Sequence, residues 1–178
     1  MITKSNLKDM LTAIGYVMSA KRDIYEKSYP HFDCMMQVDF NGSGSIIYPE
    51  EKGIKITRKT TCNFSQPENF VVLECVTRLL DKGYRPEHIE LEKEWSLGHT
   101  SKGGYADILV KDSNGKTLFI VECKTAGNEY KKELSNMLND GGQLFSYWQQ
   151  ERSCRWLVLY TSDLKNMTVE YFTDSINC

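Results

Sequence analysis

The apolar residues between positions 5 and 19 recur three and four positions apart, which predicts one amphipathic helix. They are Leu7, Met10, Leu11, Ile14, Val17 and Met18. Residues 34–58 instead alternate in short runs around a turn at 41–44, a pattern typical of strands. The expected strands are 34–40, 45–48 and 54–57. The amino-terminal part is therefore predicted to be a helix followed by a β-hairpin.

The pattern becomes clearer after a polar connector at 60–69, where we place the boundary between a subdomain 1–66 and a core 67–178. Two segments of the core have helical periodicity: 68–81, and 129–151 with a break at Gly141 and Gly142. Other segments have strand character: 89–97, 105–111, 118–124, 155–160 and 169–172. Together they predict an α/β fold, with a mixed central sheet of about four or five strands flanked by helices.

The composition fits one globular domain in a reducing compartment. The chain has 178 residues, of which 40% are hydrophobic and 26% charged. It contains no apolar stretch of membrane-spanning length and no signal-peptide pattern, so we expect a cytoplasmic protein that does not enter a membrane. Six cysteines without a C-x-x-C pair indicate neither a disulfide nor a zinc framework. A formal net charge of −2 excludes a basic surface overall, though not a local one.

Candidate chemistry lies on the two strands that flank Asn114 and Gly115. This dipeptide is typical of a two-residue hairpin loop, because both residues tolerate positive φ. A loop of that kind places Asp107 directly opposite Glu122, on the same face of the sheet. Side chains alternate along a strand, so Lys124 shares that face with Glu122. A three-residue loop would shift the pairing by one position and turn Asp107 away.

Two opposed carboxylates repel each other unless a cation lies between them. Mg²⁺ prefers oxygen ligands and is often held by one or two carboxylates together with water and phosphate oxygens. Asp107 and Glu122, with Lys124 beside them, therefore predict a site for metal-assisted phosphodiester cleavage. The alternative is structural: Lys124 neutralises Glu122, and Asp107 lies at a solvated strand end.

The same residues carry a resemblance. Ala106 and Asp107, followed after fourteen residues by Glu122, Cys123 and Lys124, resemble the core motif of the PD-(D/E)xK nuclease superfamily, with Ala106 in place of the usual proline. The resemblance implies a restriction-endonuclease-like fold. It also implies that Asp107, Glu122 and the Cys123 carbonyl bind Mg²⁺ or Mn²⁺, and that Lys124 acts on the attacking water.

A second element strengthens the resemblance. Gln143 and Tyr147 follow the Glu-x-Lys strand with the spacing Q-x-x-x-Y, which is similar to the element in RecB-type nucleases and type I restriction R subunits. Residues four apart share a helix face, so both side chains would position DNA there. The alternative is that Tyr147 simply packs into the core.

Glu74 has two interpretations of equal weight. In many of these nucleases a helical glutamate reaches the metal, and Glu74 lies in an apolar helical segment where a charge is unusual. Its alternative partner is Arg78, four residues later, in an ordinary helical ion pair. Glu94 is a weaker candidate for the same metal role.

Residues 67–163 as a whole resemble the nuclease region of restriction-modification enzymes, including type I R subunits and nucleases fused to an adenine methylase. The resemblance implies an endonuclease that cleaves double-stranded DNA, assembled with or fused to a helicase motor, a methylase or specificity domains. No G-x-x-x-x-G-K-[ST] loop is present, so cleavage alone is expected of this chain. Two alternatives remain: a RecB-type repair or recombination nuclease, and a non-catalytic nuclease-like module that binds DNA.

Overall fold

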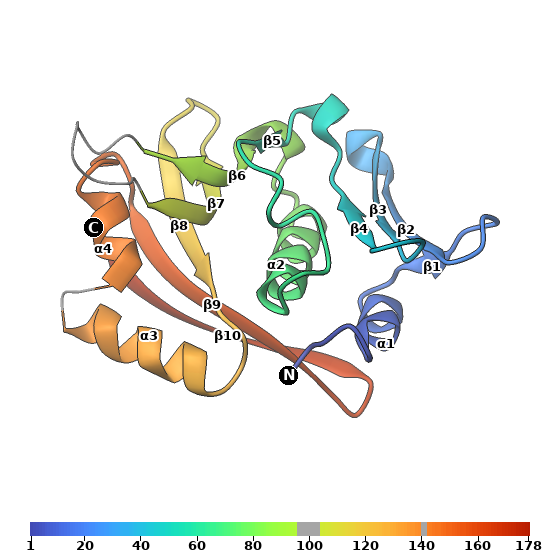
Figure 1. Cartoon of the computed structure of the whole chain (residues 1–178). Helices are drawn as coiled ribbons and strands as arrows, with labels where there is room; N and C mark the ends of the chain where they lie inside the picture. The colour runs from blue at the N-terminus through green and yellow to red at the C-terminus, as the bar shows by residue number, and fades with distance from the viewer. Residues whose placement is uncertain (96–103, 140–141) are drawn as a thin grey trace.

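The computed structural model describes residues 1–95, 104–139 and 142–178, and this part of the chain forms four α-helices and two β-sheets (Figure 1). The first sheet is antiparallel, in the order β1-β2-β3-β4. Its strands are Val17–Met18, Ile24–Tyr29, Cys34–Asp39 and Ser45–Ile47, and α1 (Leu7–Ala13) precedes them. The expected amino-terminal helix and hairpin are therefore present, with two further strands between them.

The second sheet is mixed and has the order β10-β9-β8-β7-β6-β5. In chain order its strands are Lys55–Ile56, Ile89–Glu94, Tyr105–Lys111, Thr117–Cys123, Trp156–Lys165 and Thr168–Asn177. β5 pairs with β6, and β8 with β9, in parallel; the other neighbours are antiparallel. This is the predicted mixed sheet, with six strands in the described residues.

Helices cover both faces of the second sheet. They are α2 (Glu68–Asp81), α3 (Asn128–Leu138) and α4 (Gly142–Trp148), and short 3-10 turns occur at Pro30–Phe32, Glu50–Lys52 and Pro86–His88. Alternation along β8 separates the two layers. Val121 and Cys123 pack in the cluster that contains α2, while Ile120 packs in the cluster that contains Leu144 of α4. The sheet is therefore the middle layer between α2 and the α3–α4 pair.

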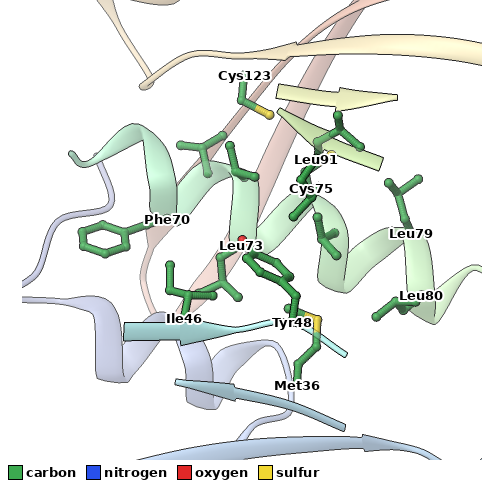
Figure 2. Packing of buried hydrophobic residues seen from close by; sticks show 14 of the residues in the cluster. Met36, Ile46, Tyr48, Phe70, Leu73, Cys75, Leu79, Leu80, Leu91 and Cys123 are labelled. Carbon is green, nitrogen blue, oxygen red and sulfur yellow. The ribbon is translucent and has the colours of Figure 1, made fainter. Parts of the chain in front are cut away.

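α2 is buried on all sides, because it lies between the two sheets. Figure 2 shows Met36 and Ile46 of the first sheet on one side of Leu73, and Leu91 and Cys123 of the second sheet on the other. A helix with apolar residues all round is expected in such a position. One hydrophobic cluster thus joins the segment 1–66 to the rest of the chain.

The helix predicted over 5–19 is shorter than expected. α1 ends at Ala13, and Gly15 has a φ of +89°, which turns the chain out of the helix. Val17 and Met18 then pair with β2 and stay exposed, so their apolar character does not reflect burial. The predicted strand 89–97 ends at Glu94, and residues 96–97 lie outside the described part.

Candidate active site

The β7–β8 hairpin pairs its strands in the expected register. The paired residues are Ile108 with Val121, Leu109 with Ile120, and Val110 with Phe119. The turn itself differs from the prediction. Asp112 N–H donates to the Lys116 carbonyl (2.8 Å), which leaves a three-residue loop of Ser113, Asn114 and Gly115. Ser113 therefore does not pair with Lys116.

A β-bulge compensates for the longer loop. Lys111 pairs with Thr117 while Val110 pairs with Phe119, so Leu118 is an extra residue on β8. The third residue of the loop shifts the pairing by one position, and the extra residue on β8 shifts it back. Beyond the bulge, β7 and β8 therefore pair in the register that a two-residue loop would have produced.

Asp107 is the residue before Ile108, where the pairing of β7 with β8 ends, and it bonds directly to β8. Its Oδ2 accepts a hydrogen bond from Cys123 N–H at 2.7 Å. Burial raises the pKa of Asp107 to about 7. Burial and the charge of Asp107 both raise the pKa of Glu122, whose side chain is only 2% exposed. The structure thus brings the two predicted carboxylates together.

Lys124 lies against this pair. Its Nζ donates to Glu122 Oε1 at 2.6 Å and lies 3.4 Å from Glu68 Oε1. Burial favours the neutral amine, but the two carboxylates outweigh it and hold the pKa of Lys124 above its usual value. The second oxygen of Glu122, Oε2, is buried and has no hydrogen-bond partner in the described residues. A buried carboxylate oxygen without a hydrogen-bond partner is a suitable ligand for a cation.

Glu68 was not singled out from the sequence. It is the first residue of α2, and its pKa is raised by burial although Lys124 acts in the opposite direction. An acidic residue in the first turn of a helix is usually explained by the helix dipole. The sequence therefore held no signal that Glu68 would reach Lys124.

Glu92 was also missed. It lies on β6 opposite Asp107, between the pairs of Leu91 with Ile108 and Lys93 with Ala106. Its φ is +53°, which is uncommon for a residue with a side chain, and its carboxylate accepts a hydrogen bond from Thr60 N–H at 3.1 Å.

Glu94, the weaker candidate for the metal role, is exposed. It accepts a hydrogen bond from the Tyr105 hydroxyl at 3.1 Å. The acidic side chain of β6 at the site is therefore Glu92.

Glu74 lies in the ion pair that was its alternative interpretation. Its carboxylate accepts hydrogen bonds from Arg78 Nε (3.0 Å) and from the Tyr160 hydroxyl (2.5 Å). Glu74 lines a separate cavity with residues of α1 and of the β9–β10 turn. The structure does not bring Glu74 to Asp107.

Gln143 and Tyr147 share one face of α4, as their spacing predicts. Gln143 is exposed, and its Nε2 donates to the Tyr147 hydroxyl at 3.3 Å. Tyr147 is fully buried, stacks on Trp95 with ring centroids 5.3 Å apart, and donates to the Tyr105 carbonyl. Burial raises the pKa of Tyr147, and so does the nearby charge of Glu122. Tyr147 is thus a core residue that borders the site.

A cleft of about 420 Å³ opens beside Asp107. Its lining comes from β6, β7, the start of α2 and the segment before α2: Arg58, Thr60, Thr61, Ser65, Gln66, Glu68, Asn69, Glu92, Tyr105 and Asp107. In the described residues no three His, Cys, Asp or Glu side chains converge to form a complete metal cage. A metal ion bound here would have to take its remaining ligands from a carbonyl, water or a phosphate, as Mg²⁺ often does.

No family model matches the chain, and a search of the curated proteins found no match. The described residues contain no helix that is both long and apolar enough to cross a bilayer.

Proposed function

We propose that this chain is a Mg²⁺-dependent endodeoxyribonuclease of the PD-(D/E)xK type, which cleaves double-stranded DNA in a restriction-modification system. One observation carries the proposal: Asp107 and Glu122 lie together on neighbouring strands, with Lys124 bonded to Glu122. In this proposal the mixed sheet flanked by helices is a restriction-endonuclease-like core. Target recognition and translocation come from a helicase motor, methylase or specificity domain.

The electrostatics of the pair favour a bound cation. Burial raises the pKa of both carboxylates, and the charge of Asp107 raises that of Glu122 further, so ionising both without a counter-charge is unfavourable. A divalent ion bound at the unpaired Glu122 Oε2 would offset that penalty. Asp107, Glu122 and the Cys123 carbonyl are the groups that would hold Mg²⁺, and Mn²⁺ fits the same oxygen ligands.

Each residue has a distinct task in the reaction. When bound, the metal polarises the phosphate and lowers the pKa of a water. Lys124 remains protonated at neutral pH, so it orients the attacking water and stabilises negative charge on the phosphate, and does not act as a base. Water attacks phosphorus and the bond to the 3′ oxygen breaks, leaving a 5′-phosphate and a 3′-hydroxyl.

Metal binding to the purified chain tests the proposal. We expect calorimetry to detect Mn²⁺ binding to the wild type, and a loss of about tenfold or more in affinity for Asp107→Asn and Glu122→Gln. Glu94→Gln is the matched control, because Glu94 is an exposed carboxylate on the neighbouring strand and should leave the affinity unchanged. Equal binding by the wild type and Asp107→Asn, or none by either, would overturn the metal site.

Cleavage assays separate the endonuclease from its alternatives. We expect the wild type to nick or linearise closed circular DNA with Mg²⁺, and Lys124→Ala to lose at least a hundredfold in rate. Degradation of linear DNA alone would indicate the RecB-type alternative. A chain that binds metal through both carboxylates but leaves circular and linear DNA intact would indicate the non-catalytic module.

A further inference from the structure

The segment 57–66, here called the strap, connects β5 to α2 (Figure 1). Five of its residues line the cleft: Arg58, Thr60, Thr61, Ser65 and Gln66. Both sheets anchor the strap. Thr57 N–H donates to the Leu91 carbonyl on β6 at 3.1 Å, and Ile46 N–H on β4 donates to the Cys62 carbonyl at 2.9 Å. The strap is therefore held in a defined position between the sheets.

The middle of the strap is bonded to the cleft itself. Thr60 N–H donates to the Glu92 carboxylate, and Asn69 Nδ2 on α2 donates to the Thr60 carbonyl at 2.9 Å. The bond from Thr60 gives the buried Glu92 carboxylate a hydrogen-bond partner. The two bonds to the Thr60 backbone also hold the neighbouring strap residues in position.

Arg58 is the cation that the strap presents to the cleft. Its guanidinium lies over the ring of Tyr105, with the Arg58 Cζ 4.1 Å from the ring centroid. Tyr105 is two residues before Asp107 on β7, and all three residues line the same cleft. Arg58 is exposed and forms no ion pair within the described residues. Lys124, by contrast, is already occupied by Glu122 and Glu68.

We propose that Arg58 binds a backbone phosphate of the DNA duplex next to the scissile phosphate, and that the strap is one wall of the DNA-binding groove. This inference rests on the proposed nuclease function. The acidic cleft would repel a duplex, so the phosphates need a positive group on the facing wall. A guanidinium supported by an aromatic ring is restricted in position, and its planar fork of donors matches phosphate oxygens.

The neighbouring side chains of the strap fit the same ligand. Thr61, Ser65 and Gln66 line the cleft, and hydroxyl and amide groups are common phosphate contacts in protein–DNA complexes. Such contacts position the duplex without reading its sequence. The strap therefore orients the DNA over Asp107 and does not select the target.

Binding of a short fluorescent duplex, measured by anisotropy in Ca²⁺ to prevent cleavage, tests the inference. We expect Arg58→Ala to weaken binding about tenfold and to reduce the slope of log affinity against log salt by about one. Arg58→Lys keeps the charge and should retain that slope while losing part of the affinity. Tyr105→Leu should weaken binding with the charge still present, because the guanidinium loses its support.

Arg152 provides a matched control. It is also an exposed arginine over an aromatic ring, 4.3 Å from the centroid of Trp148, but it does not line the cleft. Arg152→Ala should bind the duplex as the wild type does. Unchanged affinity and salt slope in Arg58→Ala, or equal losses in both variants, would overturn the inference.

Metal binding distinguishes failure of the inference from failure of the proposed function. If Mn²⁺ binding depends on Asp107 but Arg58→Ala binds DNA normally, the strap inference is wrong and the nuclease proposal stands. If Arg58→Ala weakens DNA binding but the wild type binds no metal, the phosphate contact stands and the nuclease proposal is wrong. A wild type that binds no duplex overturns the strap inference, and the metal titration then decides the nuclease proposal separately.

Discussion

Asp107 is partly buried next to a second carboxylate, and burial raises its pKa to about 7. The folded-state pKa of Asp107 therefore exceeds the value of 3.8 expected in the unfolded chain. The contribution of Asp107 to stability is fully present below pH 3.8 and is lost as the pH rises through about 7. Without metal, the ionised site is therefore a source of instability at alkaline pH. Residues at functional sites often lower stability in this way.

The substitution Asp107→Asn tests this electrostatic cost. Asparagine keeps an oxygen that can accept the Cys123 N–H but removes the charge. In metal-free buffer at about pH 8.5 we expect the variant to be more stable than the wild type by roughly 1–3 kcal/mol. The difference should shrink as the pH falls below about 7, where Asp107 is protonated in the folded protein.

Thermal unfolding across this pH range provides the measurement. Asp9→Asn is the control, because Asp9 lies on the exposed side of α1, remote in the fold from the hairpin. It should show no comparable pH-dependent gain. An Asp107→Asn variant that is less stable than the wild type at alkaline pH would show that the carboxylate is stabilised by its surroundings.

Contacts between elements set the position of Tyr147. α4 is short, and the hydroxyl of its Tyr147 donates to the carbonyl of Tyr105, the first residue of β7. Gly104 leaves room for the ring: a Cβ at this position would lie 2.5 Å from Tyr147 Cε1. The close approach of α4 to β7 therefore depends on a missing side chain.

Gly104→Ala should displace the Tyr147 ring and destabilise the fold by about 1–3 kcal/mol. The clash is specific, so the cost should be smaller when the ring is absent. We expect chemical denaturation to show that Gly104→Ala costs less in a Tyr147→Leu background than in the wild type. Additive costs would mean that the glycine is needed for another reason.

At the scale of the whole molecule, α2 joins the two sheets. Apolar side chains from both sheets pack on it, and the Tyr16 hydroxyl bonds to Thr77 Oγ1 of α2 at 3.0 Å. Lys27 on β2 pairs with Asp81 at the end of the same helix at 2.7 Å. The buried apolar residues of segment 1–66 therefore belong to the same hydrophobic cluster as those of α2 and the second sheet.

We expect the chain to unfold in one cooperative step. Leu73 is fully buried in the middle of α2, and Leu73→Ala should destabilise both sheets together by about 2–5 kcal/mol. Tryptophan fluorescence reports on the second sheet and its helices, while far-ultraviolet circular dichroism reports on the whole chain. The two transitions should coincide in wild type and variant; separate transitions would show that 1–66 unfolds independently.

Local patterns predicted the parts of the fold in which neighbours in sequence decide the outcome. The bounds of α2 and of β7 agree with the periodicity, and the faces of β8 agree with strand alternation. The hairpin register was also predicted, although the turn was not, because the loop and the bulge at Leu118 compensate. The expected pairing of Asp107 with Glu122 followed from these local rules alone.

What the sequence by itself determined is therefore the acidic pair, its lysine and the layered α/β order, since each depends on spacings within one hairpin or helix. The tertiary structure decided which other groups surround them. Glu68, Glu92 and Arg58 come from a helix start, a neighbouring strand and the strap, and no periodic pattern links such distant positions. The tertiary structure also decided that Glu74 pairs with Arg78, because the packing of α2 between the two sheets directs the Glu74 side chain to a separate cavity.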